Sequence, residues 1–125
     1  VKSNGAAQLR ATVHAGAVVT LDAITSVATS LGARRVAARA LQWAQERPVR
    51  SVVVSDAEAL EACERFLADH RMLVGPACGA SLALAAGPHE ALAGFERVLV
   101  IACGGATATI DQIRRWARPG RAVDL

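Results

Sequence analysis

Two short aliphatic runs, each followed by a helix-like pattern, constrain the fold of this 125-residue chain more than any other feature. The runs are Val52–Val54 and Val98–Ala102, and a third apolar run covers Met72–Val74. Uninterrupted aliphatic runs of this length are typical of strands buried on both faces of a sheet. Strands that alternate with helices predict an α/β fold with a mostly parallel sheet and flanking helices. So few strands make a thin sheet, which indicates a missing partner segment.

Capping and breaking residues mark where the helices are expected. Ser55 and Glu58 form an S-x-x-E capping box at the start of the clearest helix. Pro76 is suited to the first turn of a second helix, which is rich in small apolar residues. The remaining helices are predicted at residues 6–14, 38–46 and 109–117.

The composition fits a chain with a hydrophobic core and no obvious nucleic-acid partner. Hydrophobic residues make up 53% of the sequence, and the net charge of +3 is dispersed. Four arginines lie on or after the last predicted helix, without interleaved aromatic residues. They are Arg114, Arg115, Arg118 and Arg121. Cations complement the dipole at the C-terminal end of a helix, so a solvated helix end is favoured over nucleic-acid binding.

The apolar runs are much shorter than the ~20 residues that a membrane-spanning helix needs, and no signal peptide is visible. The three cysteines follow no zinc-ligand spacing, and their odd number argues against a disulfide framework. We therefore expect a reducing compartment, the cytoplasm.

Cys103, Gly104 and Gly105 follow the last aliphatic run, and as a lone motif they give a weak chemical signal. In open α/β sheets ligands bind beyond the carboxyl ends of the strands. A Gly-Gly pair lets the backbone approach a flat or anionic ligand closely. The alternative is a tight turn with a buried structural cysteine, and the spacing alone leaves both interpretations open.

The other cysteines and the histidines favour structural roles. Cys63 lies on a predicted helix face, and Cys78 lies in the small-residue helix, so both are expected to be core thiols. The histidines have no Cys, Ser or acidic partner at a motif spacing, and each is expected to be a surface or capping residue. They are His14, His70 and His89.

Three segments together resemble a known family. They read "HAGAVVTLDAITSVATSLGARRVAARAL", "VVVSDAEALEACERFLADHRMLVGPACGASLALAA" and "RVLVIACGGATATIDQIRRW". In this order they resemble the C-terminal part of the serine dehydratases. These belong to the pyridoxal-phosphate (PLP) enzymes that also include threonine deaminase and the tryptophan synthase β-subunit. The resemblance covers nearly the whole chain, and it rests on ITSVA…LG, SD-x-EA, PACGA and CGG in combination.

The resemblance implies a fold and a reaction. Residues 1–125 would form the C-terminal segment of the large, three-layer PLP-binding domain of a tryptophan synthase β-like enzyme. The reaction would be β-elimination from L-serine or L-threonine, giving pyruvate or 2-oxobutanoate and ammonia, in an enzyme that is commonly a homodimer. One alternative is a non-catalytic remnant that serves as a structural or interaction subunit. Another is a related lyase or racemase on the same fold.

The resemblance also implies which residues meet the cofactor. Cys103 matches the family cysteine beside the pyridine nitrogen, Gly104 and Gly105 would keep the backbone clear of the cofactor, and Ser30–Leu31 would border the ring. A neutral thiol can donate a hydrogen bond to an unprotonated pyridine nitrogen. A carboxylate would instead hold that nitrogen protonated, so a thiol suits direct expulsion of a leaving group.

A monovalent-cation site is implied as well, formed by the backbone carbonyls of Ala6, Leu31 and Ala33 and an acidic side chain. The acidic position is Lys2 in this chain, and a lysine cannot bind a cation. Two hypotheses remain: the Lys2 ammonium occupies the potassium site, or the site is lost.

The chain departs from the family pattern at two further positions and lacks two motifs. Gly75 stands where a glutamate is usual, and Thr107 where an asparagine is common. The Schiff-base lysine and the glycine-rich phosphate loop of the family lie upstream of the matching region, and Lys2 is the only lysine here. We therefore expect no catalytic residue in these 125 residues, and expect catalysis to need an N-terminal segment of the same enzyme or a companion chain.

Overall fold

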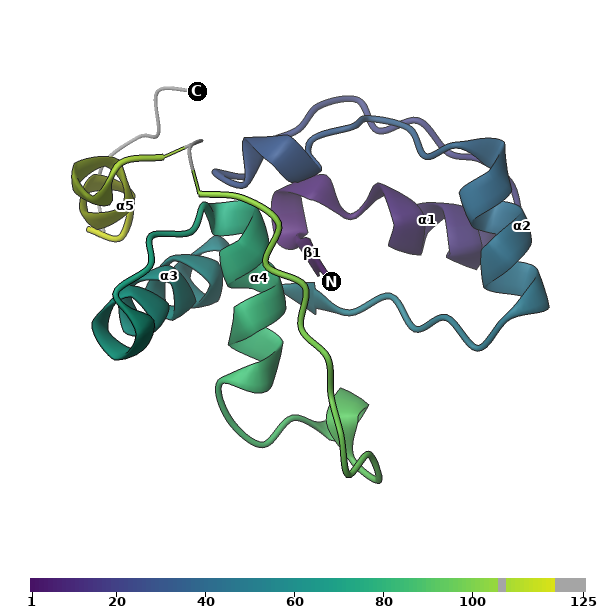
Figure 1. Ribbon diagram of the computed structural model, residues 1–125. Helices are drawn as coiled ribbons and strands as arrows, with labels where there is room; N and C mark the ends of the chain where they lie inside the picture. The colour runs from purple at the N-terminus through teal and green to yellow at the C-terminus, as the bar shows by residue number, and fades with distance from the viewer. Residues whose placement is uncertain (106–107, 119–125) are drawn as a thin grey trace.

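The computed structural model describes residues 1–105 and 108–118. Helices dominate these residues, and a small parallel sheet lies between two groups of helices (Figure 1). In chain order the elements are β1 (Lys2–Ser3), the 3₁₀ turn η1 (Asn4–Ala6), α1 (Gln8–Ala15), η2 (Thr29–Leu31), α2 (Ala38–Glu46), β2 (Val53–Val54), α3 (Asp56–His70), α4 (Pro76–Ala85), η3 (Glu90–Leu92) and α5 (Ile110–Trp116). None of the described helices has the length and apolar character needed to cross a bilayer.

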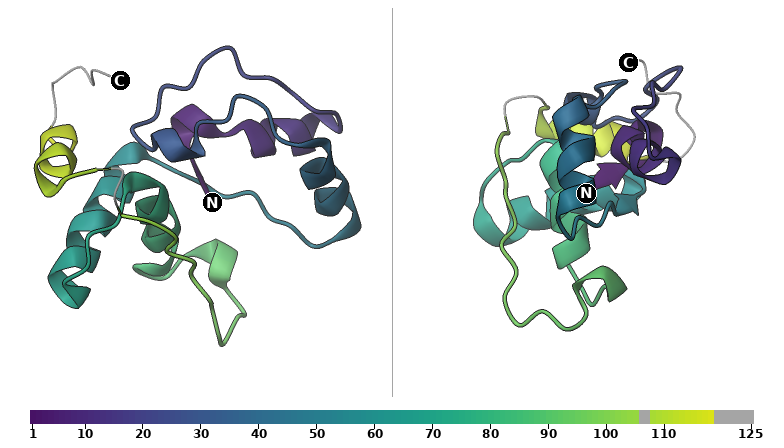
Figure 2. Two further views of the ribbon diagram at one scale, coloured as in Figure 1. Left: turned by 45° about the horizontal axis from the view of Figure 1, so that its top comes forward. Right: turned by 90° about the vertical axis from the view of Figure 1, so that its right-hand side faces the viewer.

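The sheet joins the beginning of the chain to its middle. β1 pairs with β2 in parallel, with Ser3 opposite Val54, and the Lys2 N–H donates to the Val52 carbonyl at 2.9 Å. The predicted strand at Val52–Val54 is thereby confirmed, and the class is α/β as expected. Helix α4 packs on both strands, while α1 packs on α2 farther from it (Figures 1 and 2).

Two other strand predictions are wrong for this structure. Residues 72–74 and 97–102 are extended but form no ladder with any described residue. Val98, Leu99 and Ile101 are 47%, 87% and 70% exposed, although their sequence is that of a buried strand. A strand requires a neighbouring strand to hydrogen-bond its backbone, and none of the described segments lies beside residues 97–102 to do so.

The helices follow their local signals closely. Helix α2 covers residues 38–46, as predicted. The Ser55 hydroxyl accepts from the Glu58 N–H at 3.1 Å, and the Glu58 carboxylate accepts from the Ser55 N–H at 2.6 Å, so the capping box forms. Pro76 occupies the first turn of α4. Helix α5 has a similar box between Thr109 and Gln112, which the sequence analysis did not identify.

The core lies mainly where α3, α4 and α5 meet, and it contains Leu60, Cys63, Cys78 and Ile113. Close approach of α3 and α4 depends on Gly79, because a Cβ there would lie 2.1 Å from the Ala59 carbonyl oxygen and 2.5 Å from the Cys63 sulfur.

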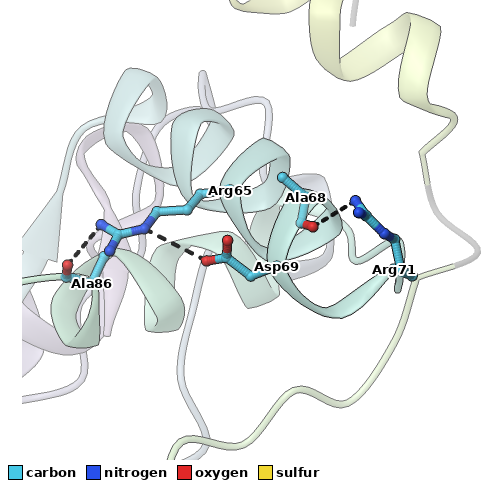
Figure 3. Close-up of polar contacts among 5 residues, drawn as sticks. All are labelled: Arg65, Ala68, Asp69, Arg71 and Ala86. Atoms are coloured by element: carbon cyan, nitrogen blue, oxygen red, sulfur yellow. Dashed lines mark hydrogen bonds and ion pairs between the residues drawn. The ribbon is translucent and has the colours of Figure 1, made fainter.

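Two arginines satisfy carbonyl groups at helix ends (Figure 3). The Arg65 guanidinium donates to the Ala86 carbonyl at 2.8 Å, and it also lies 3.8 Å from the Asp69 carboxylate. Arg71, in a left-handed conformation with φ of 58°, donates to the Ala68 carbonyl at 2.6 Å. Arg65 therefore links α3 to the end of α4, and Arg71 closes α3.

The substitution Gly79→Ala tests the α3–α4 contact. We expect it to lower the free energy of unfolding by about 2 kcal/mol, because the added methyl group has no room. Urea unfolding followed by circular dichroism measures this, with Gly87→Ala as the control, since no atom lies within 4 Å of a Cβ at Gly87. Alanine is the better helix former, so a stabilised Gly79→Ala protein would contradict the close contact.

Candidate functional site

The candidate site lies at the N-terminal end of α4, where two segments distant in sequence come together. The Gly104 carbonyl accepts from the Gly75 N–H and from the Cys78 thiol, both at 3.3 Å. The turn η2 packs on α4 as well (Figure 1). The structure therefore brings the Cys-Gly-Gly segment and the Ser30–Leu31 turn to the same helix.

Cys103 is exposed at the end of the extended segment. The interpretation of this residue as a buried structural cysteine is therefore wrong, and its thiol is accessible in this structure. A thiol is a weak hydrogen-bond donor and carries no charge when protonated, so it suits an unprotonated ring nitrogen.

The two glycines differ in what surrounds them. No atom lies within 4 Å of a Cβ built at Gly104, so this side of the backbone is open. A Cβ at Gly105 would lie 2.2 Å from the Leu73 carbonyl oxygen, so only glycine lets the chain pass this closely. Gly105 thus fixes the position of the segment, and Gly104 leaves room beside Cys103 for a flat group.

In the η2 turn the Ser30 side chain faces solvent, while the Leu31 carbonyl accepts hydrogen bonds from other elements. Ser30 is exposed and Leu31 is half-buried. The Leu31 carbonyl accepts from the Lys2 ammonium at 3.2 Å and from the Gln8 amide at 3.0 Å. Burial lowers the pKa of Lys2 from its ordinary value.

The implied cation ligands lie around this contact. Ala6 is buried at the end of η1, and Ala33 is exposed just after η2. The Lys2 ammonium lies against Leu31, one of the three carbonyls that the resemblance implies. Among the described residues, no group of three His, Cys, Asp or Glu side chains is placed to hold a metal ion.

Gln8 was missed by the sequence analysis. It is 1% exposed, and its Oε1 atom is buried without a hydrogen-bond partner in the described structure. Gln8 and Thr12 are polar residues four positions apart on α1, and both are buried. That spacing was the one available signal, because it places two polar side chains on the same helix face.

The remaining cysteines and histidines have the structural roles expected of them. Cys63 and Cys78 are buried, and desolvation raises the pKa of Cys63 to about 11. His14 and His70 are exposed. His89 caps η3, since its Nδ1 accepts from the Ala91 N–H at 3.0 Å.

Two of the expectations concern residues outside the described part of the chain. They are the departure at Thr107 and the position of Arg121. Arg114, Arg115 and Arg118 are exposed, in agreement with a solvated helix end.

The class of the chain follows from its match to one protein family. The family described as "Pyridoxal-phosphate dependent enzyme" matches residues 1–104, so the chain belongs to this family. The chain forms part of the α/β fold that the tryptophan synthase β-like members of this family have.

Among known proteins the chain is similar to serine dehydratases. It is 44% identical to the rat protein "Serine dehydratase-like", over 91% of this chain and 37% of the rat protein. It is also 44% identical to human "L-serine dehydratase/L-threonine deaminase", over 88% of this chain and 36% of the human protein. A fungal L-serine ammonia-lyase from Rhizomucor miehei has a similar structure, with a TM-score of 0.79 and 27% identity over 93% of this chain and 39% of the fungal one. The chain therefore spans little more than a third of the length of these relatives.

Thiol labelling tests the exposure of Cys103. In the native 125-residue chain at pH 8, iodoacetamide is expected to label Cys103 rapidly and the other two cysteines slowly. Cys63 is buried, and with its pKa at about 11 only ~0.1% of it would be thiolate at this pH. Peptide mapping by mass spectrometry identifies the labelled residue, and the denatured chain is the control in which all three react. Labelling of Cys63 before Cys103 would contradict the arrangement.

Proposed function

We propose that the chain is part of a PLP-dependent L-serine or L-threonine dehydratase, which converts its substrate by β-elimination to pyruvate or 2-oxobutanoate and ammonia. The observation that carries this proposal is the exposed Cys103 thiol beside the open face of Gly104. The high identity to proteins named serine dehydratase along most of the chain supports it.

The residues of this chain would bind and orient the cofactor. PLP supplies an electron-withdrawing ring when bound. The Cys103 thiol would donate to its ring nitrogen, and Gly104 would leave room for the ring edge. Ser30 and Leu31 would border the ring from η2, which packs on the same helix. The absence of a carboxylate at position 103 is consistent with an unprotonated ring nitrogen.

Proton transfer would depend on a lysine that lies outside these residues. We infer that an N-terminal segment of the same enzyme, or a companion chain, supplies this lysine and the phosphate-binding loop. The chain covers only 37% of the length of its rat relative, which supports the inference.

The apolar surface of residues 98–101 supports it as well. These residues line a groove of about 310 Å³ together with Val1, Leu84 and Leu92. A strand from the completing polypeptide would cover this apolar surface. A homodimer in the cytoplasm is the expected assembly and compartment.

We infer that the Lys2 ammonium takes the place of the monovalent cation. It donates to Leu31, and the Gln8 amide donates to the same carbonyl, so two fixed side chains hold the oxygen that a cation would otherwise attract. The second hypothesis, a site that is simply lost, predicts no role for the Lys2 charge.

A non-catalytic subunit is the second candidate, favoured by the departures at Lys2 and Gly75. A related lyase or racemase is the third. Pyruvate release from L-serine supports the dehydratase, D-serine formation supports a racemase, and a purified protein without PLP-dependent absorbance supports the non-catalytic subunit.

Substitutions of Cys103 in the completed enzyme test the proposed contact with the cofactor. Cys103→Ser retains a neutral donor, so we expect pyruvate release close to that of the unmodified enzyme. Cys103→Asp would hold the ring nitrogen protonated, and we expect kcat to fall by about tenfold, which corresponds to roughly 1.4 kcal/mol in the barrier. Steady-state kinetics with L-serine and L-threonine measure both. Equal activity of the Ser and Asp variants would contradict the proposed hydrogen bond from Cys103 to the ring nitrogen.

The cation hypothesis is tested by exchanging potassium for a large organic cation at constant ionic strength. We expect the activity of the unmodified enzyme to be insensitive to this exchange, because the ammonium is part of the chain. Lys2→Glu restores an acidic ligand and should make activity depend on potassium, while Lys2→Met should lose activity that potassium does not restore. Strong activation of the unmodified enzyme by potassium would contradict the hypothesis.

A further inference from the structure

The Asp56 side chain turns away from its own helix toward the segment before η2. Its Oδ1 accepts from the Ser26 hydroxyl at 2.7 Å, and its Oδ2 accepts from the Val27 N–H at 2.9 Å. The Ser26 oxygen in turn accepts from the Ala28 N–H at 3.0 Å and from the Ser3 hydroxyl. A series of hydrogen bonds therefore runs from β1 through residues 26–28, the segment before η2, and ends at the Asp56 carboxylate in α3.

Most of this network lies in the interior. Ser3 and Ser26 are 0% and 1% exposed and Val27 is 4% exposed, while Asp56 itself is half-buried. Bonds to an ionised carboxylate are stronger than neutral ones, and a buried donor left unpaired costs more than the bond itself contributes. The position of the Ser26–Ala28 segment thus depends on Asp56.

Asp56 is not needed to cap its own helix. The Ser55–Glu58 box already satisfies the start of α3, so both oxygens of Asp56 are free to serve the neighbouring segment. Asp56 also lies two residues after the end of β2, and β2 is paired to β1, so the backbone near Asp56 has a fixed position.

The segment leads straight into η2, the turn that packs on α4. Ala28 precedes η2, and its carbonyl accepts from the Leu31 N–H at 2.8 Å. At the far end of the turn, the Leu31 carbonyl is held by Lys2 and Gln8. The turn is anchored at both ends, while Ser30 between the anchors is exposed.

We propose that Asp56 is a positioning residue for the Ser30–Leu31 turn, and that it sets the fit of this turn against the cofactor. The proposal rests on the proposed function for the role of the turn. It goes beyond that function in assigning the placement of the turn to a carboxylate that does not itself reach the cofactor.

The test compares Asp56→Ala and Asp56→Asn in the completed enzyme. The matched control is Asp111→Ala, which removes an exposed acid from the first turn of another helix. Amide hydrogen exchange at Val27, Ala28 and Leu31 reports on the anchor without any cofactor. The dissociation constant for PLP, the visible absorption band of the bound cofactor and the split between kcat and KM report on positioning.

We expect Asp56→Ala to speed exchange at these three amides, with the rest of α3 still protected. It should also weaken PLP binding by about tenfold and shift the absorption band, as the loss of charge-assisted bonds implies. Asp56→Asn keeps the shape and one acceptor, so its effects should be intermediate, and it remains informative if the Ala variant does not fold. Asp111→Ala should behave as the unmodified enzyme does.

The measurements distinguish a failure of the Asp56 inference from a failure of the proposed function. If the unmodified enzyme binds PLP and both Asp56 variants bind it with the same constant and spectrum, this inference is wrong and the proposed function stands. If the unmodified enzyme binds no PLP, the proposed function is wrong and the inference falls with it.

Discussion

Hydrogen bonds to the segment Ser26–Leu31 connect the small sheet, α1 and the start of α3. Asp56 holds the first part of this segment, and Lys2 and Gln8 hold its last carbonyl. Because the partners come from three different elements, the position of the segment depends on all three being in place. The candidate site depends on this constraint, since the turn and the Cys-Gly-Gly segment reach the same helix by different routes.

The parts of the fold that local chemistry determines could be predicted from the sequence. The capping box at Ser55, the proline at the start of α4 and the bounds of α2 at residues 38–46 each involve residues a few positions apart. Each was found where expected. The aliphatic run at Val52–Val54 also found a partner in β1.

The rest depends on contacts between distant residues. The run Val98–Ala102 has the composition of a central strand, but in the described structure it lacks a neighbour to complete its backbone hydrogen bonds. Gln8 and Asp56 find their partners 23 to 30 residues away, so no short motif marks them. The family resemblance linked Cys103 to the site, and that role stays a prediction, whereas spacing alone left a structural role equally open.

The exposed run at residues 98–101 has a consequence for the chain when it is handled alone. It is aliphatic and uncharged, with open hydrogen-bonding groups along its backbone, the composition found in segments that stack into cross-β fibrils. Left uncovered, these residues would be able to pair with identical copies of themselves. A completing polypeptide of the kind proposed above would therefore also protect the chain against aggregation.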